Sequence, residues 1–96
     1  MSTTVRDNPA ENRYEVYDDE QLAGFAVYNV TDHQIAFTHT EVAPAFGGRG
    51  LAKQLVTEAL DDVRARGGKV EPLCPFVRGW IERHPEYADL VVQREA

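Results

Sequence analysis

Hydrophobic and polar residues alternate at a strand-like period through the first half of the chain. Strand-forming residues fill three segments, 13–17, 22–30 and 34–42, which are separated by short polar turns. Short alternating segments of this kind are typical of an antiparallel meander. Gly24 falls inside the second segment, where a glycine indicates a bulge or the close approach of another backbone.

The pattern changes to a helical period after residue 50. Apolar residues there form one stripe, made of Leu51, Leu55, Val56, Ala59, Leu60 and Val63. Gly67 and Gly68 are suited to end this helix. A short strand over 69–73 follows, and Pro75 suits the first position of a second helix. Because the third and fourth strands flank a helix, we expect them to run parallel through a right-handed crossover.

The length and composition of the chain predict a single domain. Its 96 residues, 43% of them hydrophobic, allow a single globular core. Residues 1–12 are polar without an apolar period, so we predict a flexible tail there and a single domain over 13–96. The expected fold class is α/β (α+β): a three-stranded antiparallel meander followed by a helix, a parallel strand and a C-terminal helix.

Charge and composition exclude several classes of protein. A net charge of −6 argues against a nucleic-acid partner, which usually binds a basic face. Cys74 is the single cysteine, so no intramolecular disulfide forms, as in reducing compartments. No apolar run approaches the ~20 residues that span a bilayer. We expect a cytoplasmic monomer or homodimer without a membrane partner, and without a metal, since the histidines and the cysteine lack ligand spacing.

A glycine-rich turn, AFGGRGLA over residues 45–52, joins the third strand to the first helix. The first N–H groups of a helix have no helical partners and bind anions. Glycine lets the backbone turn sharply and places no Cβ in the way of a phosphate, and Arg49 could add a charge-assisted contact. The turn matches neither the P-loop nor the dinucleotide-binding fingerprint. It indicates a phosphate site, the alternative being a merely flexible loop.

This turn resembles the acetyl-CoA pyrophosphate loop of the GNAT acetyltransferases, which usually reads Arg/Gln-x-x-Gly-x-Gly/Ala. Gly50 and Ala52 match its last two fixed positions, whereas Gly47 stands where Arg or Gln is usual. The wider chain resembles a subfamily of small stand-alone GNAT-like proteins. The segments that carry this resemblance are HTEV (39–42), GRG (48–50), PLCP (72–75) and HPEY (84–87).

The resemblance implies an N-acetyltransferase that uses acetyl-CoA as cosubstrate and acetylates an unidentified small-molecule or protein amine. The residues it implies for cofactor binding are Val42, Gly47, Gly48, Arg49, Gly50, Leu51, Ala52 and Lys53. The N-terminal helices that usually shape the acceptor pocket of GNAT enzymes have no counterpart in the predicted elements. Two alternatives therefore stay open: a CoA-binding module without turnover, and a structural domain with a chance glycine turn.

Three residues are candidates for the chemistry. Cys74 lies between a strand end and a helix start, where the helix dipole favours a thiolate, although free cysteines are often simply buried. A cysteine recurs here in the subfamily, so the acetyl group could pass through Cys74, or the amine could attack directly. His39 and Glu41 are candidate bases, or else a structural histidine and a solvated carboxylate. Strand alternation predicts that Phe37, His39 and Glu41 share one face.

Tyr87 and His84 belong to the HPEY segment near the C-terminus. Tyr87 could contact either the cofactor or the core. His84 precedes a proline and is expected to mark a helix end.

Overall fold

A five-stranded sheet packed against one long helix forms the centre of the molecule. The computed structural model describes residues 2–32 and 34–92. Its strands are β1 (Thr3–Asn8), β2 (Arg13–Asp18), β3 (Gln21–Thr31), β4 (Gln34–Val42) and β5 (Lys69–Pro72). Its α-helices are α1 (Leu51–Ala65) and α2 (Pro75–Arg83), and its 3-10 helices are η1 (Pro44–Phe46) and η2 (Pro85–Leu90).

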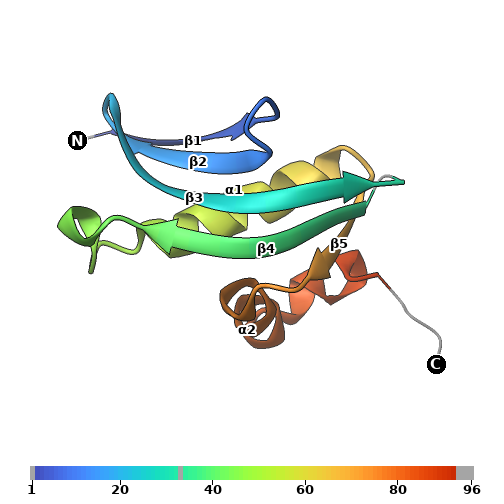
Figure 1. The fold of residues 1–96 in the computed structure, drawn as a ribbon. Coiled ribbons are helices and arrows are strands. Elements are labelled where there is room, and N and C mark those ends of the chain that lie inside the picture. Colours follow the sequence, from blue (N-terminus) through green and yellow to red (C-terminus); the bar gives the residue numbers. More distant parts are fainter. Residues whose placement is uncertain (1, 33, 93–96) are drawn as a thin grey trace.

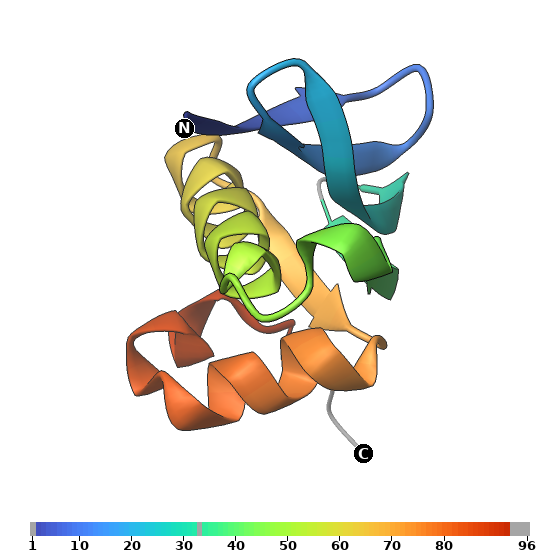
Figure 2. The same cartoon turned by 90° about the vertical axis from the view of Figure 1, so that its left-hand side faces the viewer.

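The strands lie in the order of the sequence, β1-β2-β3-β4-β5 (Figure 1). The first four are antiparallel neighbours, and β4 and β5 form a parallel pair. Helix α1 crosses between this pair and covers one face of the sheet, while α2 and η2 lie beside the β5 end (Figure 2). The predicted mixed α+β class and the parallel crossover are confirmed. Among the described residues, no helix has the length and apolar character to cross a membrane.

The predicted flexible tail over residues 1–12 is wrong, because Thr3–Asn8 form the edge strand β1. This strand pairs with β2 in unbroken register, from Thr3 opposite Asp18 to Asn8 opposite Arg13. Only Val5 is an apolar residue packed against the core, so the strand carries almost no hydrophobic signal. The meander therefore has four strands instead of three.

The core forms where the apolar stripe of α1 meets the sheet. All six predicted stripe positions, from Leu51 to Val63, are buried. Tyr14, Tyr28 and Phe37 come from three adjacent strands and cluster with ring centroids 5.4–6.2 Å apart. These rings provide much of the apolar area that makes the helix and the sheet one unit.

The hydroxyl groups of two core tyrosines are bonded to carboxylates. Tyr14 donates to Asp62 Oδ2 of α1 at 2.6 Å, and Tyr28 donates to Asp7 Oδ1 of β1. Arg66 bridges the two carboxylates, at 3.1 Å from Asp7 and 3.0 Å from Asp62. Burial, and next the hydrogen bond to Asp62, raise the pKa of Tyr14 well above its ordinary value. This network holds β1 against α1 although β1 is polar.

Gly24 is a point of close backbone approach, as its place inside a strand predicts. A Cβ at this position would lie 2.5 Å from the carbonyl oxygen of Glu41 and 3.0 Å from Val42 Cγ2. The register between β2 and β3 also shifts beside it. The glycine therefore lets β3 lie tightly against the end of β4.

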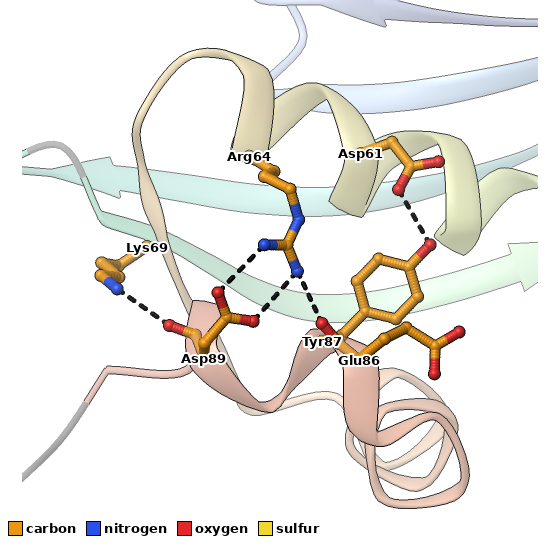
Figure 3. Close-up of polar contacts among 6 residues, drawn as sticks. All are labelled: Asp61, Arg64, Lys69, Glu86, Tyr87 and Asp89. Carbon is orange, nitrogen blue, oxygen red and sulfur yellow. Dashed lines mark hydrogen bonds and ion pairs between the residues drawn. The ribbon is translucent and has the colours of Figure 1, made fainter.

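The HPEY segment attaches the C-terminal part of the chain to α1 (Figure 3). Tyr87 is buried and donates to Asp61 Oδ1 at 2.8 Å, so of its two predicted roles the structure supports core packing. Arg64 binds both carboxylate oxygens of Asp89 at 3.0 Å. His84 follows the last residue of α2, as predicted, and its ring stacks on Trp80 with centroids 3.7 Å apart.

We expect the substitution Gly24→Ala to destabilise the fold by about 1–3 kcal/mol, because the added methyl group forces two strands apart. Urea unfolding would measure the loss. Gly79→Ala is the matched control: it lies inside α2, its Cβ would meet only Arg83 Nη2 at 3.9 Å, and it should gain about 0.5–1 kcal/mol. Equal stability of Gly24→Ala and the parent protein would contradict this account.

Tyr87→Phe should cost about 0.5–1.5 kcal/mol near neutral pH, because it removes the hydrogen bond to Asp61. Burial, and next that hydrogen bond, raise the pKa of Tyr87 to about 12. An unfolded tyrosine titrates near 10, so the stabilisation is complete below pH 10 and is lost as the pH rises through about 12. The difference in unfolding free energy between the two proteins should therefore shrink over this range. A difference that stays constant with pH would rule out the role of this hydroxyl.

Candidate functional site

The parallel strands β4 and β5 separate at one end of the sheet (Figure 1). Their ladder runs from Gln34 opposite Lys69 to Phe37 opposite Pro72 and ends there. The N–H of Cys74 donates to the Phe37 carbonyl at 2.8 Å, after which the chain turns into α2. Within the part of the chain that the structure describes, β4 continues to Val42 without a paired strand on that side. The N-terminus of α1 follows the free end of β4.

The glycine loop (residues 47–50) ends in a helix N-terminus that no side chain caps. Gly48 and Gly50 have φ values of +79° and +73°, in the left-handed region that favours glycine. The first helical bond is from the Gln54 N–H to the Gly50 carbonyl, and within the described residues no side chain bonds the cap. The N–H groups of residues 51–53 therefore have no helical acceptor, which gives this end a partial positive charge.

A hollow of about 170 Å³ lies in front of these N–H groups. It is lined by Val42, Phe46, Gly47, Gly48, Gly50, Leu51, Ala52, Lys53 and Phe76. Every residue predicted for cofactor binding except Arg49 is in this lining. The sequence analysis missed Phe46 and Phe76. Phe76 has the spacing of a core residue of α2, and only the turn of the chain after β5 brings it to the hollow.

Two larger hollows, of about 300 and 420 Å³, lie at the other end of α1 around Tyr14 and Arg66. Both include Asp7, whose carboxylate is already bonded to Tyr28 and Arg66. They are far from the helix N–H groups of the glycine loop. We assign the candidate site to the smaller hollow because the anion-binding groups are there.

Arg49 lies beside the hollow and is paired with a carboxylate from another turn. Its Nη1 is 2.8 Å from Asp18 Oδ2 at the end of β2. Its guanidinium also lies over the ring of Phe46, 5.7 Å from the centroid. The sequence analysis missed Asp18, because no local pattern connects two residues that are 31 positions apart.

Cys74 lies between the end of β5 and the start of α2 and is not among the residues that line the hollow. It is 4% exposed and directly precedes Pro75, the first residue of α2. Its thiol donates to Thr40 Oγ1 of β4 at 3.4 Å. The structure therefore places the predicted cysteine against Thr40, a residue that the sequence analysis gave no role.

His39 and Glu41 lie on the opposite face of β4 from Thr40. Thr40 pairs with Ala26, which is buried beneath α1, whereas Glu41 pairs with Phe25. Residues directly paired across a sheet share a face. His39 Nε2 is 3.2 Å from Glu41 Oε1, and both side chains are about 60% exposed. The structure therefore brings these two together but does not bring them to Cys74.

The prediction that Phe37, His39 and Glu41 share one face is wrong because β4 contains a bulge. Val27 pairs with His39 while its neighbour Tyr28 pairs with Phe37, so no residue of β3 stands opposite Thr38 in the ladder. An extra residue on one strand reverses the alternation beyond it. Phe37 is consequently buried under α1, and His39 and Glu41 face away from it.

These features define an α+β domain in which a parallel strand pair separates beside a helix N-terminus that no described side chain caps, and comparison with known proteins identifies its family. The family model described as GCN5-related N-acetyl-transferase matches residues 13–90. The chain therefore belongs to this family.

Solved structures show the same fold. A GCN5-like protein from Staphylococcus aureus aligns with a TM-score of 0.70 and 26% identity, over 96% of this chain and 90% of its own. A GNAT-family protein from Desulfovibrio desulfuricans has a TM-score of 0.56 and 26% identity, over 74% of this chain and 52% of its own. The ribosomal-protein-S18-alanine N-acetyltransferase of Escherichia coli shares the fold at 17% identity, with a TM-score of 0.61 over 74% of this chain and 49% of its own.

Protein NATD1 of Mus musculus is similar over a shorter segment. It is 38% identical over 47 residues, which are 49% of this chain and 43% of the mouse protein. The human protein matches at the same identity over 42% of its length. The chain thus aligns with less than half the length of these curated relatives.

Proposed function

We propose that this chain binds acetyl-CoA at the glycine loop and transfers the acetyl group to an amine. The observation that carries the proposal is the set of helix N–H groups at residues 51–53, which lie without helical acceptors beside the gap between β4 and β5. Membership of the GCN5-related N-acetyltransferase family supports acetyl transfer as the reaction. The acceptor would be a small-molecule or a protein amine. A cytoplasmic location and a monomeric or homodimeric state stay predictions from the sequence.

The residues of the hollow fit such a ligand. Apart from the adjacent residues of the chain, no described atom lies within 4 Å of where a Cβ would stand on Gly48 or Gly50, which leaves the loop backbone open to a phosphate. Val42, Phe46 and Phe76 offer apolar surface to an uncharged chain. Gly47 replaces the usual Arg or Gln of the loop, so backbone donors would provide most of the diphosphate contacts.

Acetyl-CoA supplies an acetyl group activated as a thioester. In one route Cys74 Sγ, whose thiol is bonded to Thr40 Oγ1, would attack the acetyl carbon, and CoA would leave as its thiol with the proton that Cys74 gives up. The amine nitrogen would then take the acetyl group from Sγ, which leaves as the thiol. In the alternative route the amine attacks the thioester directly. In either route the amine must lose a proton. His39 and Glu41, the bases predicted from the sequence, face away from Cys74, so they would accept this proton only in the direct route, from an amine that approaches on the exposed face of β4.

Isothermal titration calorimetry with acetyl-CoA tests the binding proposal. Ala52→Asp should weaken binding by about tenfold or more relative to Ala52→Asn, because the two side chains differ only in a charge that repels the diphosphate. The first turn of α1 holds no acidic residue, so the aspartate should also raise the unfolding free energy by about 0.3–1 kcal/mol. Weaker binding together with higher stability would separate ligand loss from misfolding. Absence of heat with millimolar acetyl-CoA, or equal affinity of the two variants, would refute the site.

Intact mass spectrometry after incubation with acetyl-CoA tests the route through Cys74. We expect the parent protein to gain one acetyl group, and Cys74→Ala to gain none and to lose at least about hundredfold in turnover. Thr40→Val is the companion variant: it keeps the shape of the side chain, removes the acceptor of the thiol hydrogen bond, and should reduce turnover less. Unchanged turnover of Cys74→Ala would establish direct attack by the amine.

A further inference from the structure

The turn between β2 and β3 lies beside the glycine loop although it is distant in sequence. Strands β2 and β4 are each antiparallel to β3. They therefore run in the same direction, and their C-terminal ends lie at the same end of the sheet. Asp18 is the last residue of β2, and the glycine loop follows β4. Figure 1 shows the two turns at the same end of the molecule.

The carboxylate of Asp18 is held against Arg49 in a largely enclosed position. Its side chain is 12% exposed, compared with 31% for Arg49, and Nη1 and Oδ2 are 2.8 Å apart. A pair with this little exposure is screened less by salt than an open surface pair. The Arg49 guanidinium also lies over the ring of Phe46, which lines the hollow of the proposed diphosphate position.

The hold of Asp18 on Arg49 is incomplete. Asp18 Oδ1 is buried and has no hydrogen-bond partner among the described residues. A buried carboxylate oxygen without a donor is unfavourable, so this pair is easier to open than a fully bonded one. An incoming diphosphate therefore competes with a breakable partner for the same guanidinium group.

We propose that Asp18 is a positioning residue that limits the affinity of the glycine loop by competing with the bound diphosphate for Arg49. This inference rests on the proposed function and adds to it a residue outside the loop. Because the diphosphate is common to acetyl-CoA and CoA, the competition weakens both complexes alike. It favours release of the product CoA at the cost of a higher KM for acetyl-CoA.

Calorimetry with CoA as the probe tests this competition. Asp18→Asn removes the charge and keeps the shape of the side chain, and it should tighten CoA binding about fivefold. Asp19→Asn is the matched control. Asp19 belongs to the same turn and carries the same charge, but its carboxylate accepts from the N–H of Ser2 and is exposed. It should change the affinity by less than about twofold, because an exposed charge is screened.

Arg49→Gln completes a double-mutant cycle. It should weaken CoA binding in the parent protein, and adding Asp18→Asn to it should produce no further change, because the competition no longer exists. Equal effects of Asp18→Asn and Asp19→Asn would reduce the role of Asp18 to general charge and overturn the proposal. So would weaker binding by Asp18→Asn, or an effect that persists in the Arg49→Gln background.

CoA binding by the parent protein distinguishes failure of this inference from failure of the proposed function. If the parent protein binds CoA but the variants do not change the affinity as expected, only the role of Asp18 is overturned. If the parent protein binds no CoA, the proposed function and this inference both fail. Thermal unfolding checks that each variant is folded, and Asp18→Ser replaces Asp18→Asn if the latter unfolds. In turnover, Asp18→Asn should lower the KM for acetyl-CoA and strengthen inhibition by CoA in equal proportion.

Discussion

The early end of the ladder between β4 and β5 is the constraint on which the rest of the site depends. Pro72 has no N–H to donate, so the parallel pairing cannot continue past it. The N–H of Cys74 makes one last bond to Phe37, and Pro75 then starts α2 in a new direction. The end of β4, the N-terminus of α1 and Phe76 of α2 consequently line one hollow.

Much of the fold could be predicted because its signals are local. The stripe of α1, the glycines that end it and the turns between strands each occupy a few consecutive residues. The edge strand β1 could not be predicted this way, because its stability comes from pairing with β2 and from the contacts of Asp7 with Tyr28 and Arg66. Those partners are far along the chain, and a polar strand gives no periodic hint of them.

In the site, too, features set by neighbouring residues could be predicted, and features set by residues far along the chain could not. The glycine loop was found from its residue types alone, since a left-handed backbone and a helix start both have compositional signatures. The face on which His39 and Glu41 lie was predicted wrongly, because one extra residue in the ladder, Thr38, reverses the alternation of β4. The bulge depends on how β4 pairs with β3, and the sequence of β4 alone does not determine that pairing.

The net negative charge of the protein does not oppose the proposed binding of a polyanion at the glycine loop, because exposed charges act only over a short distance in salt. Screening at physiological salt reduces the effect of exposed charges beyond about 8 Å, so most of the net charge of −6 does not reach the loop. The positive potential there comes from backbone dipoles, which carry no net charge and cannot be titrated away. Among the described charged side chains, Lys53 lines the hollow and adds a positive charge, whereas Asp18 and Arg49 beside it form an ion pair of opposite charges. The proposed binding of a diphosphate at the loop is therefore compatible with the net negative charge of the chain.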